Sequence, residues 1–180
     1  MANFSEAYKL TKLNEGGYAN HSWDDGGETY AGVARKFWGN HSVYKEIFQI
    51  VDRAKPLKHN QKINNARLNQ LIESFYYNEF WLKQAKGDKI ESQQLANFIF
   101  DFVVNSGFAE REINRALNSE FKARLPLNST INDNTLKYLN SFPQRSYRAI
   151  RTRRIEYLKT LPDWEQAGNG WMNRIARYPL

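Results

Sequence analysis

The chain has 180 residues, of which 41% are hydrophobic and 14% aromatic, and it carries a formal net charge of +7. This length and composition suit one domain with a buried core and argue against intrinsic disorder. The chain contains no cysteine, which excludes disulfides, thiol chemistry and cysteine-based zinc sites. No apolar run approaches the roughly 20 residues of a membrane-spanning helix. The first residues, MANFSEAYKLTKLNEGG, show no signal peptide.

The positive charge favours polyanionic surroundings, such as nucleic acid, anionic lipid or an acidic cell envelope, without choosing among them. We expect no nucleic-acid partner, because no recognition-helix or RNA-binding motif accompanies the charge. The three histidines, His21, His41 and His59, lack the helical spacing of metal ligands. We therefore expect neither a metal site nor a cofactor.

Helical patterns dominate the chain. We expect helices over residues 4–13, 33–38, 43–51, 65–80, 95–103, 110–121, 134–139 and 143–161. Gly16-Gly17 should end the first helix and Asn65 should cap the fourth. The segment LANFIFDFVVNSG, residues 95–107, is apolar nearly all round and is expected to form the central buried helix. Residues 17–30 carry the best strand signal, with tight turns at Gly-Gly and Asp-Asp-Gly-Gly. The predicted fold is mainly α, with one small β-hairpin near the N-terminus.

Residues 14–32, NEGGYANHSWDDGGETYAG, place acidic residues in a glycine-rich ribbon after the first helix. Partial desolvation of Glu15 at the end of that helix would raise its pKa, as a general acid requires. Asp24, in a polar turn, would stay ionised, and the Thr29 hydroxyl could hold a water molecule. Glycoside hydrolysis needs two such unlike carboxyl groups. The alternative is a surface loop, since Asp-Asp-Gly-Gly favours a turn by itself, and the spacing leaves both interpretations open.

The combination E-G-G-Y followed by D-x-G-G-E-T-x-x-G-V resembles the glycoside hydrolase family 108 lysozymes, which are N-acetylmuramidases or secretion activator proteins of the phage-endolysin type. Further segments are similar to that family in the same order along the chain. They are Tyr76-x-x-x-Phe80-Trp81 with Gly87-Asp88, FDFVVNSG at residues 100–107, Arg153-Arg154-x-x-Tyr157-Leu158, and Gly170-Trp171-x-x-Arg174.

The resemblance implies a lysozyme-like helical fold that cleaves the β-1,4 bond between N-acetylmuramic acid and N-acetylglucosamine, with Glu15 as the catalytic acid. Residues 1–109 would form the catalytic region and residues 110–180 a peptidoglycan-binding-like helical region, packed as one globular unit. Where family members commonly have D-P-G-G, this chain has Asp24-Asp25-Gly26-Gly27, so either Asp24 or Asp25 is the partner of Glu15. The chain also resembles the E-x8-D-x5-T arrangement of phage lysozymes, but only four residues separate Asp24 from Thr29, which leaves the role of Thr29 open.

Five further residues are candidates for substrate binding. Tyr18 and Tyr30 flank the turn and would either stack on sugar faces or pack within the ribbon. Asn105 would either bind an N-acetyl group or end its helix. Trp81 and Trp171 would either line the cleft or fill the core, as large aromatic residues often do.

Arginines recur every third residue near the C-terminus, at Arg145, Arg148, Arg151 and Arg154. They form either a solvated face or a surface that attracts anionic envelope polymers. Asp101, in an otherwise apolar helix, must find a partner if it is buried, and we expect it to make a structural hydrogen bond.

The leading hypothesis is therefore a peptidoglycan hydrolase acting on glycan strands. The alternatives are a lytic transglycosylase on the same bond, a non-catalytic peptidoglycan-binding or secretion-assisting module, and, from charge alone, a DNA-associated protein. We expect accumulation in the cytoplasm, release through a holin-like pore, and action in the periplasm or cell wall. Inversion or retention of stereochemistry stays open.

Overall fold

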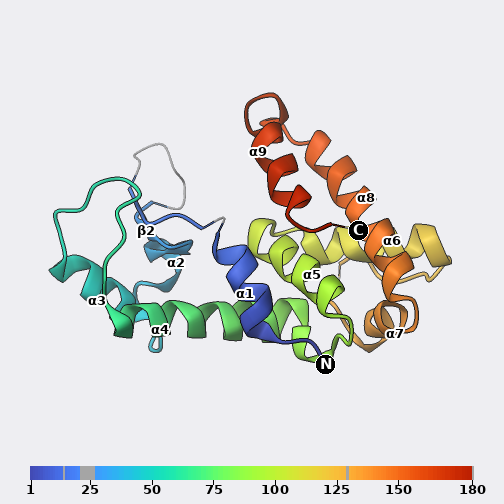
Figure 1. Cartoon of the computed structure of the whole chain (residues 1–180), viewed down its shortest axis with the longest axis horizontal. Coiled ribbons are helices and arrows are strands. Elements are labelled where there is room, and N and C mark those ends of the chain that lie inside the picture. Colours follow the sequence, from blue (N-terminus) through green and yellow to red (C-terminus); the bar gives the residue numbers. More distant parts are fainter. Residues whose placement is uncertain (14, 21–26, 129, 180) are drawn as a thin grey trace. The chain divides into compact units, whose positions relative to one another are not determined.

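The computed structural model describes residues 1–13, 15–20, 27–128 and 130–179. The chain is mainly α, with a small antiparallel sheet near the N-terminus (Figure 1), which confirms the predicted lysozyme-like fold class. By packing it divides into two compact units. The sheet unit comprises residues 12–77, and the helical unit comprises residues 1–11 and 78–180.

The sheet of the sheet unit has three strands, β1 (Tyr18–Ala19), β2 (Thr29–Tyr30) and β3 (Val33–Ala34), in that order. The predicted hairpin thus gains a third strand, and the helix expected at 33–38 is reduced to α2 (Arg35–Trp38). The cause is the backbone at Ala31 and Gly32, whose φ values of 47° and 78° turn the chain back. Val33 therefore pairs with Tyr30 before the helix begins.

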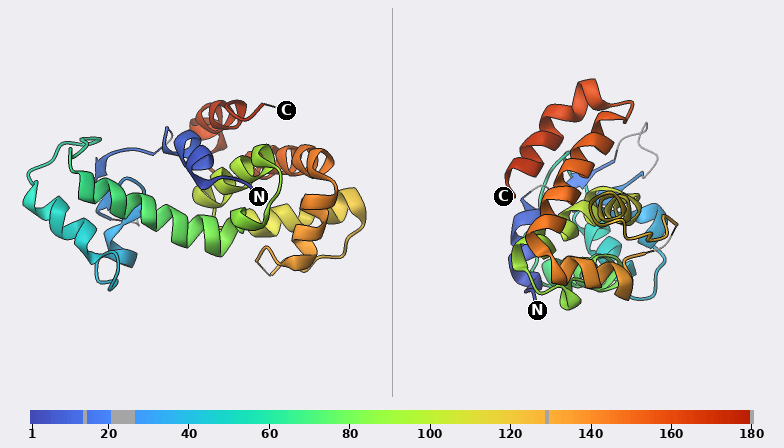
Figure 2. Two further views of the ribbon diagram at one scale, coloured as in Figure 1. Left: turned by 60° about the horizontal axis from the view of Figure 1, so that its bottom comes forward. Right: turned by 90° about the vertical axis from the view of Figure 1, so that its right-hand side faces the viewer.

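Two longer helices complete the sheet unit, α3 (Lys45–Arg53) and α4 (Ala66–Phe75), and they pack against each other (Figure 2). The predicted cap of α4 is confirmed, because the Asn65 side chain accepts a hydrogen bond of 2.9 Å from the Leu68 N–H. A π-helix, η1 (Tyr76–Ala85), continues from α4 into the helical unit.

The helical unit is built around α5 (Gln93–Asn105), which is buried along most of its length, as predicted. The helix α5 packs against the short helix η2 (Gly87–Lys89) and α6 (Ala109–Phe121), and the unit also contains α1 (Phe4–Lys12) and α7 (Asp133–Ser141). The long α8 (Pro143–Lys159) contacts α5, α6 and α7, and it lies beside α9 (Trp164–Ala176) (Figures 1 and 2). Sequence periodicity did not predict α9.

The predicted division between residues 109 and 110 falls inside the helical unit. The helix α6 begins there and packs against both α5 and α8, so packing alone does not separate the two predicted regions, and their difference in function stays a prediction. Over the residues that the structure describes, no helix has the length and apolar character that crossing a membrane requires.

Candidate functional site

Glu15 lies just beyond the end of α1, where its N–H donates to the Lys12 carbonyl at 3.2 Å. The chain after it is anchored to a neighbouring loop, since the Gly17 N–H donates to Asn60 Oδ1 at 3.0 Å. A methyl group at Gly17 would lie 2.5 Å from the carbonyl oxygens of Asn60 and Gln61. Only glycine allows this approach, so Gly17 fixes the path of the chain next to Glu15. The helix itself ends at Lys12, earlier than the sequence predicts from Gly16-Gly17.

The carboxyl group of Glu15 and the hydroxyl group of Tyr76 both lie against Gly32. A methyl group at Gly32 would overlap the Tyr76 hydroxyl and lie 2.8 Å from Glu15 Oε2. Tyr76 is 2% exposed and donates its hydroxyl proton to the Ala31 carbonyl at 2.9 Å. Glu15 itself is half-buried. A half-buried carboxyl group beside a phenol and bare backbone is partly shielded from water and still reachable, which suits a proton donor.

A second glutamate of the ribbon, Glu28, has a different environment. Its carboxylate forms ion pairs with Arg35 and, at 2.7 Å, with Lys55, and it accepts a hydrogen bond of 3.0 Å from the Tyr18 hydroxyl. Burial raises the pKa of Glu28, but the hydrogen bonds from Lys55 and Tyr18 and the charge of Arg35 outweigh it and hold the pKa below its ordinary value. Glu28 is therefore an ionised residue that holds the start of β2 in place. The sequence did not predict this role.

The other ribbon residues predicted to act in the site differ in their surroundings. The Thr29 hydroxyl is half-buried and donates to the Gly27 carbonyl at 3.2 Å, which leaves its oxygen to accept a further hydrogen bond. Tyr18 is half-buried and tied to Glu28. Tyr30 is 4% exposed and accepts a hydrogen bond of 2.9 Å from the Ile63 N–H, so the structure gives it a packing role.

The two aspartates predicted as partners of Glu15, Asp24 and Asp25, lie outside the described residues. Within the described part of the chain, no group of three or more His, Cys, Asp or Glu side chains could hold a metal ion.

The helical unit brings Asn105 and Trp171 together at a hollow of about 250 Å³, here called the α5–α9 hollow. Asn105, Ser106, Gly107 and Phe108, at and after the end of α5, form one side of it, and α8, the residue Leu161 and α9 supply Tyr157, Leu158, Leu161 and Trp171. Trp171 is half-buried and lies against Trp164, with ring centroids 6.3 Å apart.

A buried charged cluster supports one wall of the hollow. Arg154, which is 0% exposed, donates through one nitrogen to Asp101 at 2.8 Å and to Asn105 Oδ1 at 3.2 Å. Arg174 donates to both oxygens of Asp101, at 2.9 and 3.1 Å. The predicted structural role of Asp101 is therefore confirmed, and its partners lie on two other helices. Burial lowers the pKa of Arg154, and the charge of Asp101 opposes that effect.

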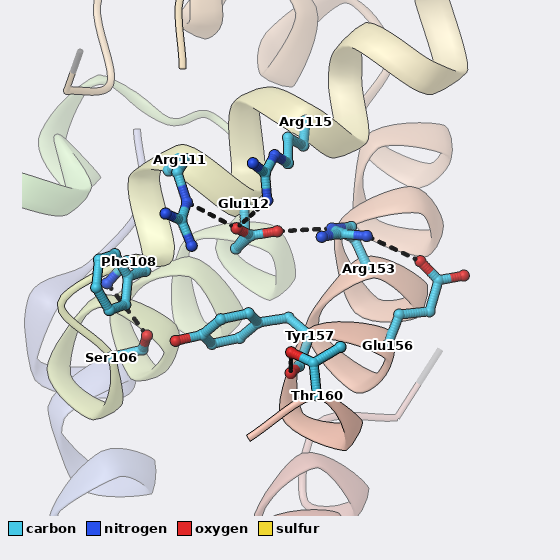
Figure 3. Close-up of polar contacts among 9 residues, drawn as sticks. All are labelled: Ser106, Phe108, Arg111, Glu112, Arg115, Arg153, Glu156, Tyr157 and Thr160. Carbon is cyan, nitrogen blue, oxygen red and sulfur yellow. Dashed lines mark hydrogen bonds and ion pairs between the residues drawn. The ribbon is translucent and has the colours of Figure 1, made fainter. Parts of the chain in front are cut away.

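A second cluster joins α6 to α8 beside the hollow (Figure 3). Glu112 is 0% exposed and forms ion pairs with Arg111 and Arg115 at 2.9 Å and with Arg153 at 2.6 Å. The Tyr157 ring points from α8 toward Ser106, and the Ser106 hydroxyl accepts a hydrogen bond from the Phe108 N–H at 3.2 Å (Figure 3).

Three of the segments noted in the sequence thus converge on one place. FDFVVNSG supplies Asp101 and Asn105, and the paired arginines supply Arg153 and Arg154. The last segment supplies Trp171 to the hollow and Arg174 to Asp101. None of these pairings follows from local spacing.

Trp81 is placed in the core of the helical unit. It is 1% exposed, and its ring meets Phe4 and Phe100 edge-on, with centroids 5.7 Å apart in both cases. Gly87 packs directly on the indole, where a methyl group would overlap the ring. The structure therefore leaves no indole face open to a glycan.

The row of four arginines does not form one exposed face. Nine residues of helix turn by about 900°, so the first and last members point to opposite sides. Arg154 is buried accordingly, and Arg145 is exposed and paired with Glu120 at 2.8 Å. Arg151 is half-buried and Arg148 is exposed.

The mainly α fold, with a half-buried glutamate after the first helix, places the chain among the lysozyme-like proteins. The model of glycosyl hydrolase family 108 matches residues 8–107, more than half of the chain. The chain belongs to this family. The matched residues include Glu15 and Asn105 and end at Gly107, so α6 to α9 lie beyond them.

A solved structure, that of SagA from Brucella abortus, is similar to this chain in fold. It superimposes with a TM-score of 0.66 at 20% sequence identity, over 97% of this chain and 90% of SagA. The similarity therefore extends through the C-terminal helices that the family model does not reach. None of the curated proteins compared with the chain matches it.

Proposed function

We propose that the protein is a peptidoglycan hydrolase, an N-acetylmuramidase that cleaves the β-1,4 bond between N-acetylmuramic acid and N-acetylglucosamine. Membership of a glycosyl hydrolase family supports a glycan substrate. The observation that carries the proposal is the position of Glu15, half-buried after α1 with its carboxyl group against Gly32 and the Tyr76 hydroxyl.

In the proposed mechanism, Glu15 enters protonated and gives its proton to the glycosidic oxygen as the bond to the anomeric carbon breaks. The sugar passes through an oxocarbenium-like transition state, which a second carboxylate stabilises. Asp24 and Asp25 are the candidates for that carboxylate. Thr29 would orient the attacking water, accepting a hydrogen bond from it because its own proton is given to Gly27.

Glu28 is not a candidate for the proton donor. Its lowered pKa, together with its ion pairs to Arg35 and Lys55, keeps it ionised at neutral pH. Its proposed contribution is indirect. It fixes the start of β2, and so the position of Thr29 next to it.

Substitution of Glu15 tests the proposal. Glu15→Gln keeps the shape of the side chain and removes the acid, and loss of general acid catalysis alone slows an enzyme by about 10²–10⁴-fold. We expect a loss of that order in the clearing of a suspension of purified cell walls. The control is Glu6→Gln, the same change at an exposed position on α1, which should clear the suspension like the unmodified protein.

Asp24→Asn and Asp25→Asn are tested singly. The variant that no longer clears the suspension identifies the second carboxylate. Lysis by Glu15→Gln at the unmodified rate would overturn the proposal. Pelleting with cell walls without any clearing, by the unmodified protein, would instead support a binding module.

A further inference from the structure

The amide group of Asn105 has one orientation. Its side chain meets Arg154, and a guanidinium group carries only hydrogen-bond donors. The amide oxygen must therefore face Arg154, as it does at 3.2 Å. The NH₂ group makes no hydrogen bond with any other residue that the structure describes. It is left as a donor on a residue that lines the α5–α9 hollow.

Arg154 is itself held firmly, so this orientation is preorganised. Its guanidinium is fully buried and paired with Asp101. Its carbon Cζ lies 5.1 Å from the ring centroid of Phe98 and 4.8 Å from that of Phe102. A donor fixed before the ligand arrives loses little conformational entropy on binding.

The remaining walls of the hollow are mostly apolar. Leu158 and Leu161 contribute aliphatic surface, and Tyr157 and Trp171 contribute aromatic surface. Phe108 is 53% exposed, and the Arg111 guanidinium lies 4.4 Å from its ring centroid. No charged side chain lines the hollow among the residues described, so the ligand that fits is neutral.

We propose that the α5–α9 hollow binds the acetamido group of an N-acetylglucosamine unit of a glycan strand, with the Asn105 NH₂ donating to the acetamido carbonyl. The methyl group would then contact the leucines, and a sugar face would lie on Phe108 or Trp171. The volume of about 250 Å³ is below that of pockets for drug-sized ligands, which suits one sugar unit. This inference rests on the proposed function, because it takes the glycan strand as the substrate.

The same features disfavour N-acetylmuramic acid in this hollow. Its lactyl carboxylate would be brought against a lining without a cationic side chain among the residues described, so the hollow offers it no ion pair. Arg154 is engaged by Asp101 and Asn105.

Binding is measured by NMR on the Glu15→Gln protein, which should not degrade the ligand. The probe is chitotriose, the trimer of N-acetylglucosamine, and cellotriose is the matched sugar without acetamido groups. We expect chitotriose to shift the Asn105 side-chain amide and Trp171 indole resonances, and cellotriose to shift neither. Absence of these shifts at saturating chitotriose, or equal shifts with cellotriose, overturns the proposal.

Two substitutions sharpen the test. Asn105→Asp retains an oxygen for Arg154 and replaces the donor by an acceptor, so the fold should persist while chitotriose binds about tenfold more weakly or worse. Gly107→Ala adds a methyl group with no atom of the described part of the chain within 4 Å, and it should also weaken binding by narrowing the hollow. Gly170→Ala, equally unobstructed on α9, should bind chitotriose normally. Undiminished binding by both Asn105→Asp and Gly107→Ala contradicts the proposal.

The two proposals fail in different ways. If Glu15→Gln abolishes lysis but chitotriose leaves Asn105 unaffected, the hydrolase stands and the acetamido site is wrong. If Glu15→Gln lyses cell walls normally while chitotriose binds at Asn105, the acid is misassigned and the sugar site stands.

Discussion

Gly32 is the residue against which both a carboxyl group and a phenol lie. The backbone there has φ +78°, and the absence of a side chain leaves room for both Tyr76 Oη and Glu15 Oε2. The geometry of the proposed acid thus depends on a residue that takes no part in the chemistry.

We predict that Gly32→Ala lowers both stability and lytic activity. Its positive φ costs about 1–2 kcal/mol for a residue with a side chain, and the added methyl group overlaps Tyr76. Gly27→Ala is the control, because Gly27 also has a positive φ, +63°, and no atom of the described residues would lie within 4 Å of the added methyl group. Thermal unfolding and cell-wall clearing are measured together. Equal losses of activity in the two variants would show that the contact with Glu15 and Tyr76 is unimportant.

Glu28 gives a pH-dependent prediction. Its pKa in the folded protein is lowered from the ordinary value of 4.5, so its ion pairs stabilise the fold above that pH. This stabilisation is lost as the pH falls through the lowered pKa. Glu28→Gln should therefore reduce the free energy of unfolding at pH 7 by about 1 kcal/mol and flatten its decline at acid pH.

Urea unfolding at pH 7 and pH 3 measures this effect. Glu73→Gln, at an exposed position on α4, is the control and should behave as the unmodified protein does. If the free energy of unfolding of Glu28→Gln falls between pH 7 and pH 3 by as much as that of the unmodified protein does, the ion pairs of Glu28 do not cause the decline.

At the scale of elements, buried charges join the helices of the helical unit. Asp101 on α5 receives Arg154 from α8 and Arg174 from α9, and Glu112 on α6 receives Arg153 from α8. Breaking a buried ion pair by removing one partner typically costs 3–5 kcal/mol, because the remaining charge is left uncompensated.

Asp101→Asn should accordingly lower the free energy of unfolding by about 3–5 kcal/mol. Glu120→Gln removes the partner of Arg145 at an exposed site and should cost less than about 1 kcal/mol. Chemical denaturation of the two variants measures the difference. Similar small losses in both would mean that the buried cluster contributes no more than a surface pair.

Local patterns predicted most of the helices but few of their partners. Apolar periodicity identified α5, and Asn65 marked the start of α4, because both signals are contained in a few adjacent residues. The third strand was missed, since its pairing depends on the positive φ at Ala31 and Gly32. Arg154 was grouped with surface arginines because its partner, Asp101, lies 53 residues away.

The candidate site was predictable only where its signal is contained in a few adjacent residues. Glu15 could be singled out from its place after an apolar helix and before two glycines. Whether an aromatic residue stacks on sugar or fills the core depends on burial, which the sequence does not contain. Trp81 is in the core and Trp171 lines a hollow, yet both are tryptophans on helical segments.

At the scale of the whole molecule, the net charge of +7 should strengthen binding to an anionic cell envelope. We predict that binding to purified cell walls weakens as sodium chloride is raised from 50 to 500 mM, because salt screens exposed charges. Arg148→Gln should weaken binding at low salt by less than about fivefold. Arg145→Gln should have a smaller effect, since Glu120 already neutralises Arg145. Co-sedimentation measures both, and binding that is indifferent to salt would exclude an electrostatic contribution.

Mass spectrometry of digested cell walls tests whether Glu15 donates the proton that cleaves a muramic acid linkage. The unmodified protein should release fragments that end in reducing N-acetylmuramic acid, and Glu15→Gln should release none above background. Fragments ending in 1,6-anhydromuramic acid would instead identify a lytic transglycosylase. Equal release of reducing fragments by the two proteins would contradict the assignment of Glu15.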